Sequence, residues 1–109
     1  MNERDPAKAH VLAALARHVG RAQGVAAHPL AEIIGITERR LRACISLLRE
    51  EGVAVCGHPR SGYFIAATAD ELDESCRFLR SRALHSLVLE ARLRKIPFAD
   101  LVGQLHLPT

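Results

Sequence analysis

One segment of the sequence spaces its arginine side chains so that several could contact a polyanion together. If residues 37–50 form a helix, a projection at about 100° per residue puts apolar side chains on one side and a polar ridge on the other. The ridge consists of Arg39, Arg42 and Ser46, with the small Ala43 beside them. A guanidinium can donate two hydrogen bonds to guanine, and a serine hydroxyl can contact several bases. The spacing is therefore typical of a helix that reads base edges in DNA.

Further polar residues lie beside this ridge and in a glycine-rich loop that follows it. Arg40 and Arg49 flank the ridge, where DNA phosphates would run, and Thr37 precedes it as a candidate helix N-cap. In the loop, Arg60 and His58 could reach the DNA backbone. The candidate DNA-binding residues are Thr37, Arg39, Arg40, Arg42, Ser46, Arg49, His58 and Arg60.

The charge of the segment leaves a second interpretation open. Five arginines and four glutamates lie between residues 30 and 66, so the net charge there is only +1. The whole chain carries +3 with an isoelectric point near 9.1, which permits a polyanionic partner without requiring one. The alternative is that the polar face of the helix is a solvated surface with no nucleic-acid role.

Three residues upstream and within this helix have the spacing of a helix-turn-helix. A small residue at Ala31 lets two helices cross, Gly35 supplies the positive φ of a tight turn, and Leu41 packs the second helix. Apolar segments at 53–56 and 63–67 enclose Gly57–Gly62, which indicates a β-hairpin with a longer loop.

The remaining elements follow from helix start and stop signals. Asp5 and Pro6 begin a first helix, which ends at Gly20. Pro29 begins a second helix, which ends at Gly35. Thr68–Glu71 is a capping box that begins a long helix to Lys95. The apolar positions expected to define the first helix are Val11, Leu12, Leu15, Ala16 and Val19. Val25–Ala27 could add a short strand. We therefore expect a mainly α fold with a small β-hairpin, in the α+β class.

Over residues 7–67 the chain resembles the winged helix-turn-helix family, in particular the N-terminal DNA-binding domain of the biotin operon repressor and similar bacterial regulators. The resemblance lies in Leu30–Thr37, Leu47–Gly52 and Gly62–Ile65. It implies that the helix at Thr37–Glu51 enters the major groove and that the loop Gly57–Gly62, the wing, lies along the DNA backbone or minor groove. We expect no effector or catalytic domain like that of the fuller family members, so nothing about biotin carries over.

We expect residues 1–67 to form the winged helix-turn-helix domain and residues 68–109 to add a long helix and a tail. A narrow apolar stripe in the first half of that helix, formed by Leu72, Cys76, Leu79 and Ala83, is enough to pack on its own domain. The second half is apolar nearly all round and must be buried. We therefore expect a homodimer, with Leu84, Leu87, Val88 and Ala91 as the dimerisation residues. The alternative is a helix that breaks near His85 and folds back.

No metal, cofactor or catalytic function is expected. Structural zinc sites usually show two ligand pairs at short spacing, whereas only Cys56 and His58 are close together here. Cys44 and Cys76 fall at core-facing positions and are expected to be buried. No Ser/His/Asp or Cys/His arrangement and no phosphate-binding glycine loop is present.

The cellular setting is also constrained. Three widely spaced cysteines favour a reducing compartment, the N-terminus lacks the pattern of a secretory signal, and no apolar run approaches the roughly 20 residues of a membrane span. We expect a cytoplasmic protein. The excess of arginine over lysine is typical of GC-rich coding and hence of a bacterial or phage source.

Two functional hypotheses follow. The first is a sequence-specific double-stranded DNA-binding protein, such as a bacterial or phage transcriptional regulator. The second is a winged-helix module that recruits another protein and binds DNA weakly or not at all. The segment Gln104–Leu107 resembles the short motif by which replication proteins bind the sliding clamp, although its terminal aromatic residue is missing.

Overall fold

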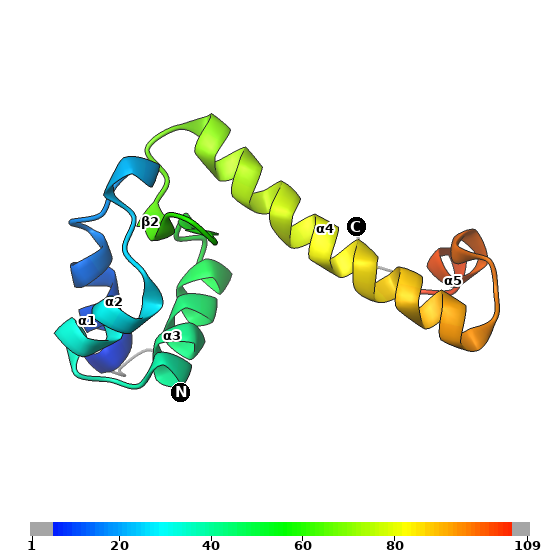
Figure 1. Ribbon diagram of the computed structural model, residues 1–109, viewed down its shortest axis with the longest axis horizontal. Helices are drawn as coiled ribbons and strands as arrows, with labels where there is room; N and C mark the ends of the chain where they lie inside the picture. The colour runs from blue at the N-terminus through cyan, green and yellow to red at the C-terminus, as the bar shows by residue number, and fades with distance from the viewer. Residues whose placement is uncertain (1–5, 106–109) are drawn as a thin grey trace. The chain divides into compact units, whose positions relative to one another are not determined.

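The computed structural model describes residues 6–105, and its contacts divide the chain into two compact units (Figure 1). The first unit ends at Ser75 and the second begins at Cys76. The division falls within one long helix, so the first two turns of that helix belong to the first unit. The boundary expected at residue 67 lies in the loop that leads into this helix.

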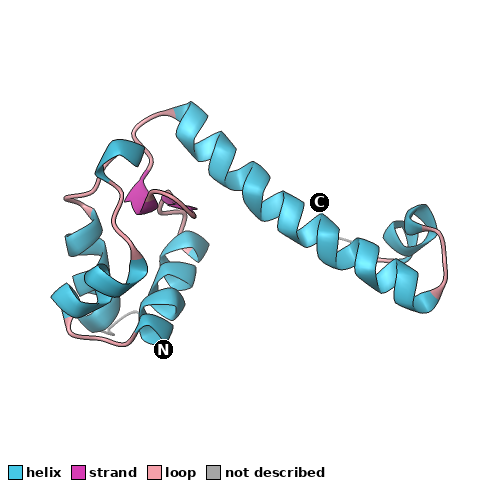
Figure 2. Ribbon diagram, viewed as in Figure 1, coloured by secondary structure: helices cyan, strands magenta, loops and turns pink. Residues whose placement is uncertain are grey.

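The described part of the chain is mainly helical with one antiparallel hairpin, as expected for the α+β class (Figure 2). In chain order the elements are α1 (Pro6–Leu15), the 3-10 helix η1 (Arg21–Gln23), α2 (Ala27–Ile34), α3 (Glu38–Glu50), β1 (Val55–His58), β2 (Gly62–Ile65), α4 (Ala69–Arg94) and α5 (Phe98–Gln104). Three helices followed by a hairpin and a long helix is the expected winged helix-turn-helix order.

The core of the first unit lies between α1, α2 and α3 and continues beneath the hairpin. Each helix contributes apolar side chains at helical spacing, so that one face of each is buried. The buried core residues include Val11, Leu15, Leu30, Ala31, Leu41, Cys44, Ile45, Leu48, Val55, Cys56 and Phe64. The buried Cys44 confirms the expectation for that cysteine.

The turn between α2 and α3 has the geometry that its sequence predicts. Gly35 adopts the left-handed conformation (φ 85°) and its N–H donates to the Ala31 carbonyl at 2.8 Å. An L-residue with a side chain is strained in that conformation, which is why glycine stands here. Two residues later, Thr37 Oγ1 accepts a hydrogen bond from the Arg40 N–H at 3.1 Å. Gly35 and Thr37 thus end α2 and begin α3.

The hairpin differs from its expected limits, because β1 begins and ends later than the predicted segment 53–56, whereas β2 begins and ends earlier than the predicted segment 63–67. β1 and β2 pair in a register that joins Cys56 to Phe64 and leaves Val53 outside the strand. Tyr63 also exchanges two backbone hydrogen bonds with Val25, at 2.7 and 2.9 Å. The candidate strand at Val25–Ala27 is therefore a single bridge, and α2 begins at Ala27 rather than at Pro29. This bridge to Val25 anchors β2 to the loop before α2.

The first helix is shorter than its apolar pattern indicates. α1 ends at Leu15, and Val19 forms a bridge with Ile65 instead of a further helical turn. Leu12 and Val19 are both exposed. Asp5, the expected N-cap, lies outside the described residues.

In the second unit, α4 continues through His85 without a break and ends at Arg94, next to the expected end. The chain then turns through Lys95, which has a positive φ of 58°, and the Ile96 N–H donates to the Ala91 carbonyl at 3.1 Å. The short helix α5 follows this turn and was not expected from the sequence. Ala91 and Leu101 are the buried side chains of this unit among residues 76–105.

One expectation about the first half of α4 is wrong. The side chains of the stripe formed by Leu72, Cys76, Leu79 and Ala83 are all exposed. Cys76 is therefore not a buried hydrophobic residue.

Candidate nucleic-acid interface

The polar ridge of α3 faces solvent because the opposite face of the helix is held in the core. Leu41, Ile45 and Leu48 are almost fully buried, which fixes the rotation of α3 about its axis. Arg39, Arg42 and Ser46 are consequently exposed, as are Arg40 and Ala43. The structure therefore brings the three predicted ridge residues to one accessible surface.

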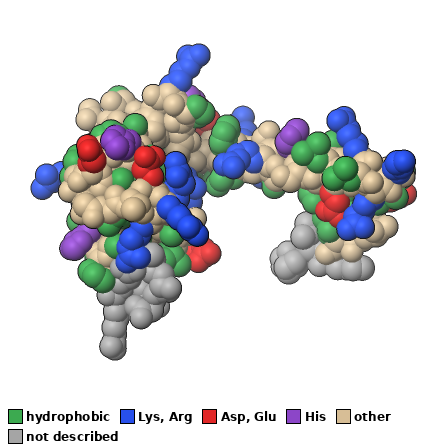
Figure 3. All heavy atoms as spheres, turned by 60° about the horizontal axis from the view of Figure 1, so that its bottom comes forward, with side chains coloured by type: hydrophobic (Ala, Val, Ile, Leu, Met, Phe, Trp, Pro, Cys, Tyr) green, Lys and Arg blue, Asp and Glu red, His purple; other side chains and the backbone are tan. Residues whose placement is uncertain are grey.

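Acidic side chains moderate the charge at the start of this ridge. Glu38 Oε1 accepts a hydrogen bond from Arg42 at 3.5 Å, and its other oxygen lies 3.4 Å from His28. His28 is also 3.7 Å from Glu32. Figure 3 shows basic and acidic side chains interspersed on the visible face of this unit. The Arg42 side chain stays 61% exposed, so its long, single contact with Glu38 leaves it accessible to another partner.

Arg49 makes a hydrogen bond inside the first unit that the sequence pattern does not predict. Its Nε donates to the Val55 carbonyl at 2.8 Å, and the side chain is half-buried between α3 and β1. Strand β1 follows α3 so closely that its first carbonyl comes within reach of the guanidinium.

The wing presents Arg60 to solvent but constrains His58. The Arg60 N–H donates to His58 Nδ1 at 3.1 Å, so in the neutral ring the proton is on Nε2. That nitrogen faces Glu74 at 4.0 Å. Arg60 is exposed and His58 is half-buried. Of the two predicted wing residues, Arg60 is the one whose side chain is accessible.

Close backbone contacts fix the position of the wing. Gly62 has a φ of 76°, and a Cβ added there would lie 2.3 Å from the Val25 carbonyl oxygen. Across the same contact, a Cβ on Gly24 would lie 2.0 Å from the Ser61 carbonyl oxygen. Any side chain at either glycine would push the wing away from the loop before α2. These two glycines therefore allow the wing to sit close to the helical core.

A polar cluster behind the wing was not anticipated. Glu71 accepts backbone N–H bonds from Arg21 at 2.9 Å and from Ala67 at 2.8 Å, and its own N–H donates to Thr68 Oγ1 at 3.1 Å. These donors stabilise the carboxylate, so the pKa of Glu71 is lowered, with the Arg21 N–H as the largest cause. The capping box at Thr68–Glu71 was the only sequence signal for this cluster.

Arg21 completes the cluster through its side chain. Its guanidinium binds Glu74, and that hydrogen bond is the main cause of a raised Arg21 pKa. The cluster joins η1 to the first two turns of α4 within the first unit. It therefore sets where α4 leaves this unit, and Glu74 also lies 4.0 Å from His58 of the wing.

The predicted dimerisation residues do not share one exposed surface. Ala91 is buried within its own unit, Leu87 and Val88 are half-buried, and only Leu84 is exposed. In the candidate clamp motif, Gln104 ends α5 and Leu105 is half-buried, while His106 and Leu107 lie outside the described residues.

Within residues 6–105, no three His, Cys, Asp or Glu side chains are grouped so that they could hold a metal ion. No helix in the same range is long and apolar enough to cross a membrane. Comparison of the chain with protein-family models, curated protein sequences and solved structures found no match.

Proposed function

We propose that this protein binds double-stranded DNA in a sequence-specific manner, with α3 in the major groove and the wing against the DNA backbone. The observation that carries the proposal is the exposed ridge of Arg39, Arg42 and Ser46 on a helix whose other face is locked in the core. A recognition helix needs this combination, because its base-reading side chains must stay accessible while its axis is held rigidly.

Each basic residue has a distinct place in the proposal. Arg39, Arg42 and Ser46 contact base edges, and Arg40 contacts phosphate beside them. Arg60 contacts the DNA backbone from the wing. Arg49 positions the hairpin relative to α3 through the Val55 carbonyl rather than contacting phosphate itself. Thr37 caps α3 and so sets where the helix begins.

The proposal further assigns the protein to transcriptional regulation in the cytoplasm of a bacterium or in a phage-infected cell. The resemblance of residues 7–67 to the winged helix-turn-helix family of regulators supports this assignment. We propose that the protein acts as a homodimer, because α4 exposes several large apolar side chains that water disfavours. No catalytic step or cofactor is part of the proposal.

A second candidate function is a winged-helix module that binds another protein. A specific observation favours it: a groove of about 370 Å³ lies beside α1 and α2. Its lining is partly apolar, with Leu30, Ile33 and Ile34, and partly basic, with His10, Arg17 and His18. Ile33 is 73% exposed, which is unusual for a side chain of that size. In this alternative the α3 ridge is a solvated surface and DNA binding is weak or absent.

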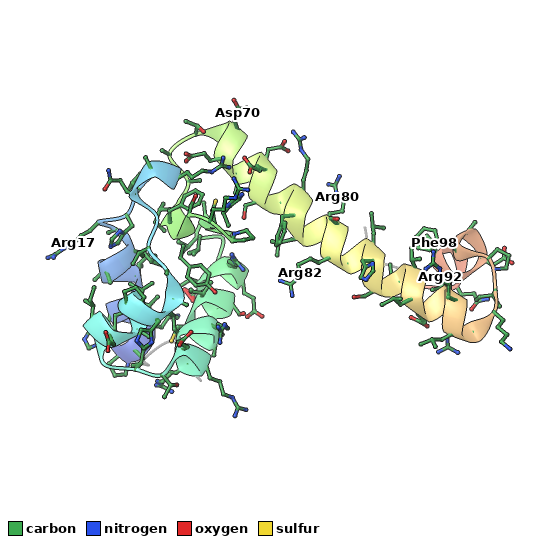
Figure 4. All side chains as sticks on the ribbon, viewed as in Figure 1. Arg17, Asp70, Arg80, Arg82, Arg92 and Phe98 are labelled. Atoms are coloured by element: carbon green, nitrogen blue, oxygen red, sulfur yellow. The ribbon has the colours of Figure 1, made fainter. Side chains whose placement is uncertain are left out.

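Gel-shift titrations on random-sequence duplex DNA separate the two functions. DNA binding predicts a complex at about 50 mM salt that weakens steeply towards about 200 mM, because phosphate contacts release counterions. The matched control is Arg17→Ala, which removes an exposed arginine in the turn after α1, outside the α3 ridge and the wing (labelled in Figure 4), and should leave binding unchanged. Absence of a complex even at low salt contradicts the proposal and favours the protein-binding module.

A further inference from the structure

The first half of α4 carries an apolar row with the spacing of a coiled-coil seam. Leu72, Cys76, Leu79 and Ala83, here called the α4 stripe, are separated by four, three and four residues. This alternation keeps side chains on one face of a helix over several turns. All four are exposed, and Leu72 and Leu79 are 41% and 43% exposed. The row runs along a single helix, so its geometry depends on α4 alone.

The order of large and small side chains in the stripe selects one orientation for a pair of such helices. In an antiparallel pair centred between Cys76 and Leu79, each leucine meets a small residue. Leu72 then lies opposite Ala83 of the partner subunit, and Leu79 opposite Cys76 of the partner subunit. A parallel pair in register would instead stack leucine on leucine and alanine on alanine, which leaves its layers alternately crowded and loose. Alternating large and small side chains across an interface fills it evenly.

The charges beside the stripe select the same orientation. Asp73 and Arg80 lie on one flank of the stripe, and Arg82 lies on the other. Figure 4 shows Arg80 and Arg82 projecting from opposite sides of α4. In the antiparallel pair, Asp73 of each helix lies near Arg80 of the other, which gives two opposite-charge pairs. A parallel pair would place Arg80 of one helix beside Arg82 of the other on both flanks, where like charges repel.

We propose that a second copy of this chain binds the α4 stripe in antiparallel orientation, with the pair centred between Cys76 and Leu79. The inference rests on the homodimer included in the proposed function, and it moves the interface away from Leu84, Leu87, Val88 and Ala91. Three of those four are at least half-buried by their own unit. The stripe, in contrast, is exposed along its whole length and complementary to itself in size and charge.

Two matched variants locate the interface. Leu79→Lys places a charge in the stripe, whereas Leu84→Lys makes the same change on another face of the same helix at nearly equal exposure, 43% against 44%. Light scattering at tens of micromolar should show a dimer for wild-type and Leu84→Lys. For Leu79→Lys the dimer dissociation constant should rise roughly 100-fold or more, because both copies lose an apolar contact. A monomeric wild-type protein, or two variants that both remain dimers, overturns the proposal.

Spin-label distances determine the orientation. Labels are attached to Ser81→Cys or Arg92→Cys in a Cys76→Ser background, because Cys44 and Cys56 are buried. With a rise of about 1.5 Å per residue, the antiparallel pair separates the two labels along the axis by about 10 Å at position 81 and about 45 Å at position 92. A parallel pair gives nearly equal distances at the two positions and overturns the antiparallel inference.

These measurements need no DNA, so their failure is distinguishable from failure of the DNA-binding proposal. A parallel dimer that still shows salt-dependent gel shifts would overturn the inference alone, and a monomer that does so would overturn the inference and the homodimer but leave DNA binding standing. An antiparallel dimer that binds no DNA would overturn the DNA-binding proposal and leave the α4 interface standing.

Discussion

Replacing Gly62 by alanine should displace the wing. Gly62 has a φ of 76°, and its added Cβ would lie 2.3 Å from the Val25 carbonyl oxygen and 2.7 Å from the Ala26 nitrogen. Both neighbours are backbone atoms, which cannot move aside as the end of a flexible side chain can. The two hydrogen bonds between Val25 and Tyr63 must therefore lengthen or break.

The cost of this substitution has two parts. A left-handed conformation costs an alanine roughly 1–2 kcal/mol. Losing two backbone hydrogen bonds adds about 1 kcal/mol each, so Gly62→Ala should destabilise the fold by roughly 3–4 kcal/mol. Gly52→Ala is the matched control, because Gly52 has a φ of 87° but nothing within 4 Å of its Cβ position. The control should show only the conformational cost of roughly 1–2 kcal/mol.

Urea denaturation followed by circular dichroism measures both values under the same conditions. The difference between Gly62→Ala and Gly52→Ala isolates the close approach of the wing to the loop before α2. Equal losses for the two variants, or a smaller loss for Gly62→Ala, would refute the argument that this contact holds the wing.

Three further predictions concern side chains around the interface. Arg49→Met should lower the free energy of unfolding by about 1.5–3 kcal/mol in urea titrations, because the hydrogen bond from a charged donor to the Val55 carbonyl is lost. Unchanged stability would contradict the positioning role of Arg49. Glu71→Gln should destabilise the protein at neutral pH, because a lowered pKa stabilises the fold only while the carboxylate is ionised. The stability difference from wild-type should shrink as the pH falls below the ordinary Glu pKa of 4.5 towards the lowered native value. A pH-independent difference in thermal melts would contradict this prediction. Glu38→Gln should strengthen DNA binding about 2- to 5-fold in low-salt gel shifts by removing a carboxylate beside Arg42, and weaker binding would argue against DNA contact at this end of α3.

Local signals were sufficient to predict the turn between α2 and α3 and the buried face of α3. Thr37 caps α3 and Gly35 ends α2 because each residue satisfies a backbone requirement that depends only on its neighbours. The buried face of α3 follows from apolar spacing for the same reason. The strand limits were less accurate, because the bridge between Val25 and Tyr63 is a contact between distant segments. No sequence pattern near Val53 indicates that the strand begins later.

The candidate site was predictable in type but not in all its contacts. Exposure of Arg39 and Arg42 follows from the helical projection, whereas the bond from Arg49 to Val55 depends on how β1 folds back beside α3. The apolar stripe of α4 could not be assigned from one sequence, because the same spacing suits burial on the chain's own domain and burial on a second copy. Helix α5 was missed because it is only seven residues long and contains Gly103.

DNA affinity of α3 variants is the most direct test of the central claim. The measurement compares wild-type, Arg39→Ala, Arg42→Ala and Arg60→Ala on a duplex selected from a genomic library and on random duplex, with circular dichroism to verify folding. Arg42→Ala should lose about 1–3 kcal/mol on the selected duplex and much less on random DNA, whereas Arg60→Ala should weaken both alike and reduce the salt slope by about one unit. If Arg39→Ala and Arg42→Ala both bind the selected duplex as tightly as wild-type does, α3 is not the reading helix and the DNA-binding account is contradicted.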